Sequence, residues 1–500
     1  MKRASLLLPL LLLLPILTGC ASKTIVLGSK KFPESNVLSK IAKRKLEQAG
    51  FTVEHKEDLG STGIVWAALK GGSIAAYPEY TATISQEILK VKGDMSEEAI
   101  RAALQKEGIG LGGELGFTDN YGLVMLKSRA DALNIHKISD LANHPDLKVG
   151  VSHEFLGRED GWKPLATKYG LNVPNTSGID HSLAYLALKN SQIDLTEAYT
   201  TDAEIAEYKL LVLEDDRNYF PKYHAVFVYR LDMPQKAVDA LKTLEGTISE
   251  DKMIAMNAEA KKTKDYNKAA ALYFAGSPNA AMTSSAPEAS SPFRVILTLI
   301  GQHLALVGSS LFLAILVGVP LGIAASRPGG VSQAILGIVG VIQTIPSLAL
   351  LALLVPIPFF GISARTAIAA LFLYSLLPIV RNTATGLLEI PASLRESAAA
   401  LGLEPGAQLF KIYLPIASRT ILAGIKTSAV INVGTATLAA LIGAGGLGQP
   451  IIRGISLNDN NTILQGAVPA ALLALAVEFG FNLVDRLLIP KGLRLPAPKD

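Results

Sequence analysis

Charged residues are distributed very unevenly along this 500-residue chain, and their distribution limits what the chain can fold into. Residues 23–275 are rich in Lys, Glu and Asp, whereas the sequence after Arg294 contains uncharged runs long enough to cross a bilayer. With a mean hydropathy of +0.34 and only 18% charged residues, the chain is too apolar for a purely soluble protein. The sequence therefore predicts a polar N-terminal domain followed by an all-α membrane domain.

Five membrane spans are predicted in the C-terminal part, and the basic residues between them set their orientation. If the first span begins outside, Arg327, Arg381 and the loop 395–426 all fall on one side, together with the basic tail. The positive-inside rule makes that side the cytoplasm, which leaves the N-terminal domain outside. The predicted spans are centred on residues 307–325, 335–355, 362–380, 421–442 and 463–484.

The first residues have the pattern of a bacterial export signal. Lys2 and Arg3 precede an apolar run at 6–17, which is short for a membrane span. The run leads into the tetrapeptide LTGC, which resembles the lipobox at which bacterial lipoproteins are cleaved and acylated on the cysteine. We therefore expect a signal peptide at 1–20 and lipidation of Cys20, with an uncleaved anchor as the alternative. Cys20 is the only cysteine, so no disulfide can form within the chain.

Residues 276–292 are rich in Ser, Ala and Pro and cannot form a core, so they are expected to be a linker. As a flexible coil, such a segment would span roughly 20 Å. The expected organisation is a signal peptide, a substrate-binding domain at 23–275, this linker, a five-span permease domain at 293–488 and a cytoplasmic tail at 489–500.

The N-terminal domain alternates strand and helix signals. Strands predicted at 24–27 and 51–55 flank a helix at 36–49, which gives a βαβ unit. Because ligands of open α/β sheets bind beyond the carboxyl ends of the strands, the segments that follow the strands are candidate sites. Further strands are predicted at 74–76, 148–151, 194–198 and 225–229.

Two cations, hydroxyl groups and several tyrosines follow these strands. A quaternary ammonium group has no N–H to donate, so a protein can hold it only with electron-rich aromatic faces and apolar contacts. A carboxylate at the other end of such a ligand calls for Arg, Lys or a hydroxyl group, and Lys30, Thr83 and Arg158 supply this set. Arg158 could instead be a structural partner of Glu159 or Asp160.

Five motifs in this domain carry a family resemblance: SKxFxE at 29–34, YPEYTxT at 77–83, REDG at 158–161, AYxTD at 198–202 and LEDD followed by FPxY within 213–223. They resemble the glycine betaine, choline and carnitine binding proteins of osmoprotectant ABC importers. The resemblance implies a two-lobed α/β periplasmic-binding-protein fold of type II. It places the family's carboxylate contacts on Lys30, Thr83 and Arg158 and its aromatic box on Tyr80, Tyr121, Tyr199 and Tyr223.

Two positions depart from the family pattern. Ala82 stands where glycine is usual, and Gly122 follows Tyr121 where a larger residue is common. Glycine betaine is the expected cargo, and choline or another betaine-like compound, such as a histidine-derived thiol betaine, is the alternative. From other classes, the alternatives are a membrane-tethered receptor that senses solutes without moving them, or an extracellular enzyme, for which no nucleophile and base motif is present.

A polar segment between two spans carries a second resemblance. Residues 396–402 read ESAAALG, and IYLP follows at 412–415. The pattern resembles the cytoplasmic EAA loop of ABC importer permeases, and a plain amphipathic connector is the alternative. Small residues allow a partner's groove to approach closely, and Gly402 lets the chain turn into a second short helix that Pro415 ends. The expected docking residues for an ATPase are Glu396, Ser397, Ala398, Gly402, Ile412, Leu414 and Pro415.

The membrane domain also contains INVGTATL at 431–438 and GAGGLGQP at 443–450, which are similar to the membrane subunit of the same importers. A type I ABC permease domain of MetI-like fold, working as a homodimer, is therefore implied. The second motif formally matches the dinucleotide fingerprint GxGxxG, but it follows a membrane span instead of a strand and is rejected. Glu478 in the last span is expected to face the bundle interior or an interface, without an assigned role.

No Walker A, HExxH or GxSxG motif occurs in the sequence. Any ATPase must therefore be a separate cytoplasmic protein, and the chain is expected to be no enzyme and to hold no metal or cofactor. A basic and aromatic run of the kind that binds nucleic acid is also missing from the sequence. We expect a multi-pass protein of the bacterial cytoplasmic membrane, with its N-terminal domain on the outer, periplasmic or extracellular face.

Overall fold

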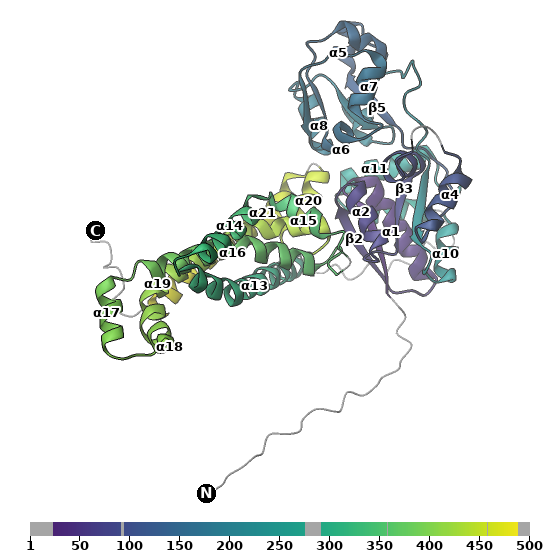
Figure 1. Ribbon diagram of the computed structural model, residues 1–500. Coiled ribbons are helices and arrows are strands. Elements are labelled where there is room, and N and C mark those ends of the chain that lie inside the picture. Colours follow the sequence, from purple (N-terminus) through teal and green to yellow (C-terminus); the bar gives the residue numbers. More distant parts are fainter. Residues whose placement is uncertain (1–23, 92–94, 276–291, 358, 458, 489–500) are drawn as a thin grey trace.

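The computed structural model describes residues 24–91, 95–275, 292–357, 359–457 and 459–488. Cys20 and the signal sequence, almost all of the predicted linker and the tail 489–500 lie outside the described residues. Figure 1 shows an α/β body, which we call the N-terminal half (24–275), seated on one end of an elongated bundle, the helical half (292–488).

The first lobe of the N-terminal half is built on a five-stranded sheet with the order β2-β1-β3-β10-β4. β1 (Ile25–Lys30) pairs in parallel with β2 (Val53–Leu59), and α1 (Pro33–Gln48) connects them, which confirms the predicted βαβ unit. Val37, Leu38 and Ile41 of α1 are fully buried in the core. The other strands are β3 (Ala76–Tyr80), β4 (Ile109–Leu111) and β10 (Ala225–Arg230).

One sequence expectation about this sheet was wrong in its boundaries. The segment 77–80 was expected to follow a strand at 74–76, but it forms β3 itself, with every residue buried. The reason is its antiparallel pairing with β10, in which Tyr80 lies opposite Ala225. The helices of this lobe are α2 (Thr62–Lys70), α3 (Thr81–Thr83), α4 (Glu97–Lys106), α10 (Gln235–Lys242), α11 (Glu250–Thr263) and α12 (Tyr266–Phe274).

The second lobe holds two small sheets, β8-β5-β9 and β6-β7. The antiparallel register of β5 and β8 places Tyr121 opposite Tyr199. Its strands are β5 (Tyr121–Leu126), β6 (Val149–Ser152), β7 (Thr176–Ile179), β8 (Thr196–Tyr199) and β9 (Leu210–Val212). Its helices are α5 (Lys127–Leu133), α6 (His153–Gly157), α7 (Trp162–Tyr169), α8 (His181–Lys189) and α9 (Ala203–Glu207).

Two chain segments connect the lobes and are hydrogen-bonded to each other. One leads from β4 to β5 and the other from β9 to β10. The amide of Asp119 donates to the carbonyl of Tyr223 at 3.0 Å, and the amide of Ala225 donates to the carbonyl of Phe117 at 3.2 Å. Paired connections of this kind are suited to a hinge, because small dihedral changes in them rotate one lobe against the other.

The described part of the helical half contains four helical segments long and apolar enough to cross a membrane. They are α13 (Pro292–Ala325), α16 (Ala364–Leu388), the run 405–442 and α21 (Asn460–Leu488). The span expected at 335–355 is instead the pair α14 (Gly330–Thr344) and α15 (Ser347–Leu354), bent by 95°. Five spans result if this pair is one broken span. The bend falls at Ile345, which is extended because Pro346 follows it.

The docking segment begins with α17 (Ala392–Ala400), and Gly402 then turns the chain with φ +69°, as expected. The expectation that Pro415 ends a second short helix was wrong. α18 (Pro405–Gln408) continues through a π-helical turn, Leu409–Tyr413, into α19 (Leu414–Thr435). Pro415 is tolerated there because it lies in the first turn of α19, next to the widened π-helical turn.

The two halves share a packed interface (Figure 1). The first lobe contacts the end of the helical half that holds the 3-10 helix Ala436–Ile442 and α20 (Gly448–Ser456). Lys56 Nζ donates to the carbonyl of Ile362 at 2.9 Å, and the amide of Ile362 donates to Ser73 Oγ at 3.1 Å. One buried apolar cluster contains residues of both halves, including Leu59 and Ile442.

Candidate functional sites

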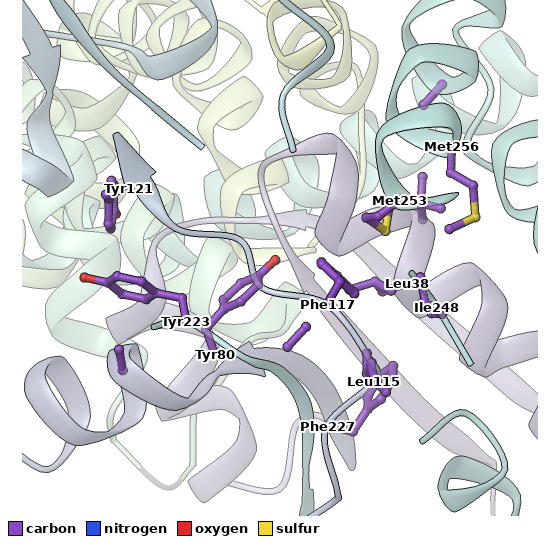
Figure 2. Packing of buried hydrophobic residues seen from close by; sticks show 14 of the residues in the cluster. Leu38, Tyr80, Leu115, Phe117, Tyr121, Tyr223, Phe227, Ile248, Met253 and Met256 are labelled. Carbon is purple, nitrogen blue, oxygen red and sulfur yellow. The ribbon is translucent and has the colours of Figure 1, made fainter. Parts of the chain in front are cut away.

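The four tyrosines expected to form an aromatic box lie in one cluster between the lobes. The Tyr121 ring lies 5.2 Å from the Tyr199 ring and 5.4 Å from the Tyr223 ring, measured between centroids. Phe32 connects Tyr80 to this group, with centroid distances of 6.4 Å to Tyr80 and 5.3 Å to Tyr199. Figure 2 shows Tyr80, Tyr121 and Tyr223 at one side of the continuous buried cluster. Because both lobes contribute rings, the cluster is complete only when the lobes are together.

Hydrogen bonds fix two of the rings. Tyr80 donates from its hydroxyl to Glu34 Oε1 at 2.6 Å, and Tyr223 donates to Asp160 Oδ2 at 2.7 Å. Burial, followed by the nearby carboxylates, raises the pKa of both phenols well above their usual value. Both hydroxyls therefore stay neutral donors, and the rings present uncharged π faces.

Arg158 is paired within its own lobe. Its Nε and Nη2 each lie 2.6 Å from an oxygen of Asp160, and both side chains are 3% exposed. Its Nη2 also lies 3.5 Å from Thr83 Oγ1, and its guanidinium lies 5.4 Å from the Tyr121 ring. The structure thus brings Arg158 and Thr83 to the aromatic cluster, and of the two expected structural partners it selects Asp160.

Lys30 also has a carboxylate partner. Its Nζ lies 2.6 Å from Glu79 Oε1, with both side chains buried, and 5.6 Å from the Tyr80 ring centroid. Every side chain proposed from the sequence for ligand binding therefore lies in one connected group. The cations of that group, Lys30 and Arg158, are each neutralised by a neighbouring acid.

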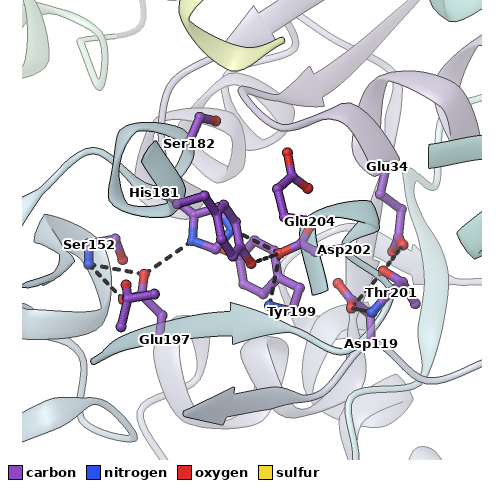
Figure 3. Close-up of polar contacts among 12 residues, drawn as sticks. Glu34, Asp119, Ser152, His181, Ser182, Glu197, Tyr199, Thr201, Asp202 and Glu204 are labelled. Atoms are coloured by element: carbon purple, nitrogen blue, oxygen red, sulfur yellow. Dashed lines mark hydrogen bonds and ion pairs between the residues drawn. The ribbon is translucent and has the colours of Figure 1, made fainter. Parts of the chain in front are cut away.

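His181 is a residue of this group that the sequence motifs did not indicate. Its ring stacks on Tyr199 at 4.3 Å between centroids, and its nitrogens lie 3.2 Å from Glu197 and 3.1 Å from Asp202 (Figure 3). Burial lowers the pKa of His181, but the hydrogen bonds to Asp202 and Glu197 outweigh burial and raise it well above its usual value. The two acids thus favour the charged form of the imidazole that stacks on one face of Tyr199. The only sequence clue to His181 was its partner Asp202, which belongs to the AYxTD motif.

Glu34 connects the two lobes by hydrogen bonds. Besides Tyr80, it accepts hydrogen bonds from Thr201 Oγ1 at 2.5 Å and from Asn257 Nδ2 at 3.2 Å. Figure 3 shows Glu34, Thr201 and Asp119 as one polar group. Burial raises the pKa of Glu34 to about 7. Its position in the motif SKxFxE was a signal that the sequence reasoning quoted without assigning a role.

The second candidate site is the docking segment at the far end of the helical half (Figure 1). Glu396, Ser397 and Gly402 are exposed, whereas Ala398 is buried. Ile412, Leu414 and Pro415 are half-buried. Two large apolar residues of this segment are exposed to solvent, Leu401 with 75% and Phe410 with 70% of its surface accessible. A surface of small residues flanked by exposed apolar groups suits a protein partner.

The sequence also matches known families over both halves. Residues 23–276 match the family described as the substrate binding domain of ABC-type glycine betaine transport systems. Residues 314–492 match the binding-protein-dependent transport system inner membrane component.

Curated relatives align with the helical half. The choline transport system permease protein OpuBB of Bacillus subtilis (strain 168) is 41% identical over 193 residues, covering 39% of this chain and 88% of that protein. The osmoprotectant import permease protein OsmY of Salmonella typhimurium (strain LT2) is 48% identical over 188 residues, covering 37% and 79%. A solved glycine betaine/carnitine/choline ABC transporter structure has 26% identity and a TM-score of 0.42, covering 50% of this chain and 97% of that one.

Fold and site together define a solute-binding domain joined in one chain to an importer permease. The chain belongs to the family of substrate-binding domains of ABC-type glycine betaine transport systems, and its helical half is the permease domain of such an importer. The predicted fold class, a periplasmic-binding-protein fold followed by a type I permease, is confirmed. The protein is a multi-pass inner-membrane component that works with a separate ATPase.

Proposed function

We propose that the aromatic cluster binds the quaternary ammonium group of glycine betaine or a similar osmoprotectant on the outer face of the membrane. This proposal rests on the convergence of four tyrosines from both lobes, Tyr80, Tyr121, Tyr199 and Tyr223. Together with Phe32, which lies between Tyr80 and Tyr199, they form a chain of rings whose neighbouring centroids are 5.2 to 6.4 Å apart. A cation without N–H groups is held by such π faces. Ligand in this position favours the closed lobes, because it contacts both of them.

A specific observation favours choline as a second candidate cargo. Lys30 and Arg158, the two cations proposed to hold a ligand carboxylate, are already neutralised by Glu79 and Asp160. A zwitterion would have to share these cations with the protein's own acids. Choline has no carboxylate and makes no such demand.

The remaining parts of the transport cycle follow from the same proposal. The docking segment with Glu396 and Gly402 receives the ATPase in the cytoplasm, and the basic loops favour this orientation. Two copies of the helical half form the pathway, and exposed apolar side chains such as Phe312 and Phe479 are available to face lipid or a second copy. Residues 1–20 direct export, and Cys20 is lipidated.

Calorimetric titration of the full chain in detergent tests the cargo. The ligands are glycine betaine, choline, carnitine, proline and a neutral sugar. Tyr199→Ala should weaken binding of a quaternary ammonium about tenfold or more, from loss of one cation–π face. Tyr208→Ala is the matched control, because this tyrosine of the second lobe contacts Lys189 and Lys261 instead of the cluster. If none of the quaternary ammonium ligands gives a measurable heat of binding, the proposed cargo is wrong.

Uptake by vesicles that contain the chain and its ATPase separates an importer from a receptor. Cargo should accumulate only when ATP is supplied. Binding without accumulation would favour a receptor that senses solutes.

A further inference from the structure

The last turn of α20 lies where the two lobes and the helical half come together. Ser456 Oγ lies 3.2 Å from two carbonyl acceptors, that of Lys31 in the first lobe and that of Ile452 in its own helix. The carbonyl of Ser456 accepts from Ser182 Oγ in the second lobe at 3.4 Å. Leu457, the next residue, is 1% exposed and belongs to the buried apolar cluster of the N-terminal half. One residue of the helical half therefore touches both lobes at once.

The same place holds an ion pair between the lobes. Lys31 Nζ lies 2.7 Å from Asp180 Oδ2, and Asp180 Oδ1 caps α8 by accepting from the amide of Ser182 at 3.1 Å. Lys31 belongs to the first lobe, and Asp180 and Ser182 belong to the second. When the lobes rotate apart about the hinge, these contacts across the lobes must separate.

α20 and the residue after it also make hydrogen bonds to the first lobe. Arg453 Nη2 donates to the carbonyl of Lys264 at 2.9 Å, and Lys264 Nζ donates to the carbonyl of Leu457. The Arg453 guanidinium lies 5.2 Å from the Tyr266 ring. These contacts do not depend on the position of the second lobe, so the first lobe can stay seated while the second one moves.

Helix α8 of the second lobe connects this junction to the aromatic cluster. α8 begins at His181, which stacks on Tyr199, and Ser182 follows it directly. In Figure 3, Ser182 lies above His181 and faces a yellow segment of the helical half. On its other side, α20 packs against α21 and the 3-10 helix Ala436–Ile442 of the helical half.

We propose that the Ser456 turn of α20 is the point at which the helical half distinguishes closed from open lobes. It recognises the surface formed by Lys31, Asp180 and Ser182, which exists only when the lobes are together. The inference rests on the proposed function in one respect, namely that ligand closes the lobes. Closure then adds a contact to α20 without requiring the N-terminal half to dock anew.

Cysteine cross-linking in the full chain tests the junction. The Ser182→Cys and Ser456→Cys pair should form a disulfide several-fold more efficiently with ligand than without. Ser73→Cys with Ile362→Cys is the matched control, because it joins the first lobe to the helical half and should not respond to ligand. Equal cross-linking of the Ser182 and Ser456 pair with and without ligand would overturn the proposal, provided that calorimetry shows ligand bound.

A functional readout uses the smallest change. Ser182→Ala should leave the ligand Kd within about threefold, while ligand-stimulated ATP hydrolysis by the assembled importer falls about 3- to 10-fold, the range for one lost hydrogen bond. Ser96→Ala, which removes the cap of α4 in the first lobe, is the control. Unchanged stimulation in Ser182→Ala would contradict the proposal.

If no tested ligand binds, the proposed cargo fails but the junction can still be examined. Closure can then be imposed by a disulfide between Lys31→Cys and Asp180→Cys. The locked chain should stimulate its ATPase more than the reduced chain does. Equal activity of the locked and reduced forms would count against α20 as the reader of closure.

Discussion

Arg158 and Asp160 form a buried bidentate ion pair, with Nε to Oδ1 and Nη2 to Oδ2 distances of 2.6 Å each. The same carboxylate accepts the hydroxyl of Tyr223, so one acid fixes both a cation and a ring of the aromatic cluster. Arg158 still faces the cluster through its contacts with Thr83 and Tyr121. The ion pair thus positions the guanidinium, and the pair as a whole carries no net charge.

Replacing Arg158 with alanine should separate the two candidate cargoes. If the guanidinium binds a ligand carboxylate, the Kd for glycine betaine should rise about tenfold or more, whereas the Kd for choline should change little. Arg158→Ala with Asp160→Asn is the control, because it avoids leaving Asp160 buried without its cation. Calorimetry measures both ligands. An equal loss for both would mean that Arg158 acts through the structure of the lobe.

Glu34 predicts a pH dependence of stability. Burial raises its pKa from an ordinary value of 4.5 to about 7, so the folded protein holds this proton more tightly than the unfolded chain. Its stabilisation is complete below about pH 4.5, is lost as the pH rises through about 7, and amounts to about 3 kcal/mol. Wild type should therefore lose stability relative to Glu34→Gln between pH 5 and 8.

Tryptophan fluorescence during thermal unfolding measures this difference. The two tryptophans, Trp66 and Trp162, both lie in the N-terminal half, so the signal reports on that half. Asp58→Asn is a useful second variant, since burial also raises the pKa of Asp58 to about 7. Parallel pH profiles for wild type and Glu34→Gln would show that Glu34 does not titrate in this range.

The turn at Gly402 should be essential for coupling. Its φ of +69° is strained for any other residue, and a glutamate would add a charge to the exposed docking surface. Gly402→Glu should abolish uptake while ligand affinity stays unchanged. Gly330→Glu is the control, since it adds the same charge at an exposed glycine outside the docking segment, where an added Cβ meets no atom within 4 Å. Uptake by Gly402→Glu near the wild-type rate would refute the docking assignment.

Glu478 of α21 and Lys426 of α19 form an ion pair in the helical half. Lys426 Nζ lies 3.4 Å from Glu478 Oε1 and donates to Asn482 Oδ1 at 2.9 Å. Glu478→Gln leaves the lysine without its counter-charge, and because both side chains are partly exposed the expected cost is at most about 1 kcal/mol. The expected result is less folded protein after heating, measured by size-exclusion chromatography in detergent. Glu478→Leu with Lys426→Met should recover most of it; a single variant as stable as wild type would show that the pair contributes nothing.

Local signals predicted much of this architecture. The βαβ unit followed from strand and helix signals around α1, and the tyrosines from motifs that follow or form strands. The registers that oppose Tyr121 to Tyr199 and Tyr80 to Ala225 bring these motifs together, and such long-range pairings are not written in any single segment. For this reason the tyrosines of the cluster could be predicted from the sequence, but the contacts between their rings could not.

Other features depend on tertiary context. The ion pairs of Lys30 with Glu79 and of Arg158 with Asp160 were not decided by composition, because each cation had several acids within reach along the chain. Hydropathy placed one continuous span across Pro346, although a proline disfavours helix at the preceding residue. Apolarity alone does not distinguish a straight span from a bent pair.

The two halves are parts of one chain, and this has a kinetic consequence. α12 ends at Phe274 and α13 begins at Pro292, so 17 residues connect them. A connection of this length keeps the N-terminal half near its seat at an effective concentration on the order of millimolar. Encounter between the halves is then independent of how much protein the cell makes, and even weak docking is nearly saturated. Selectivity for loaded over empty binding domains cannot arise from diffusion and must be decided after docking.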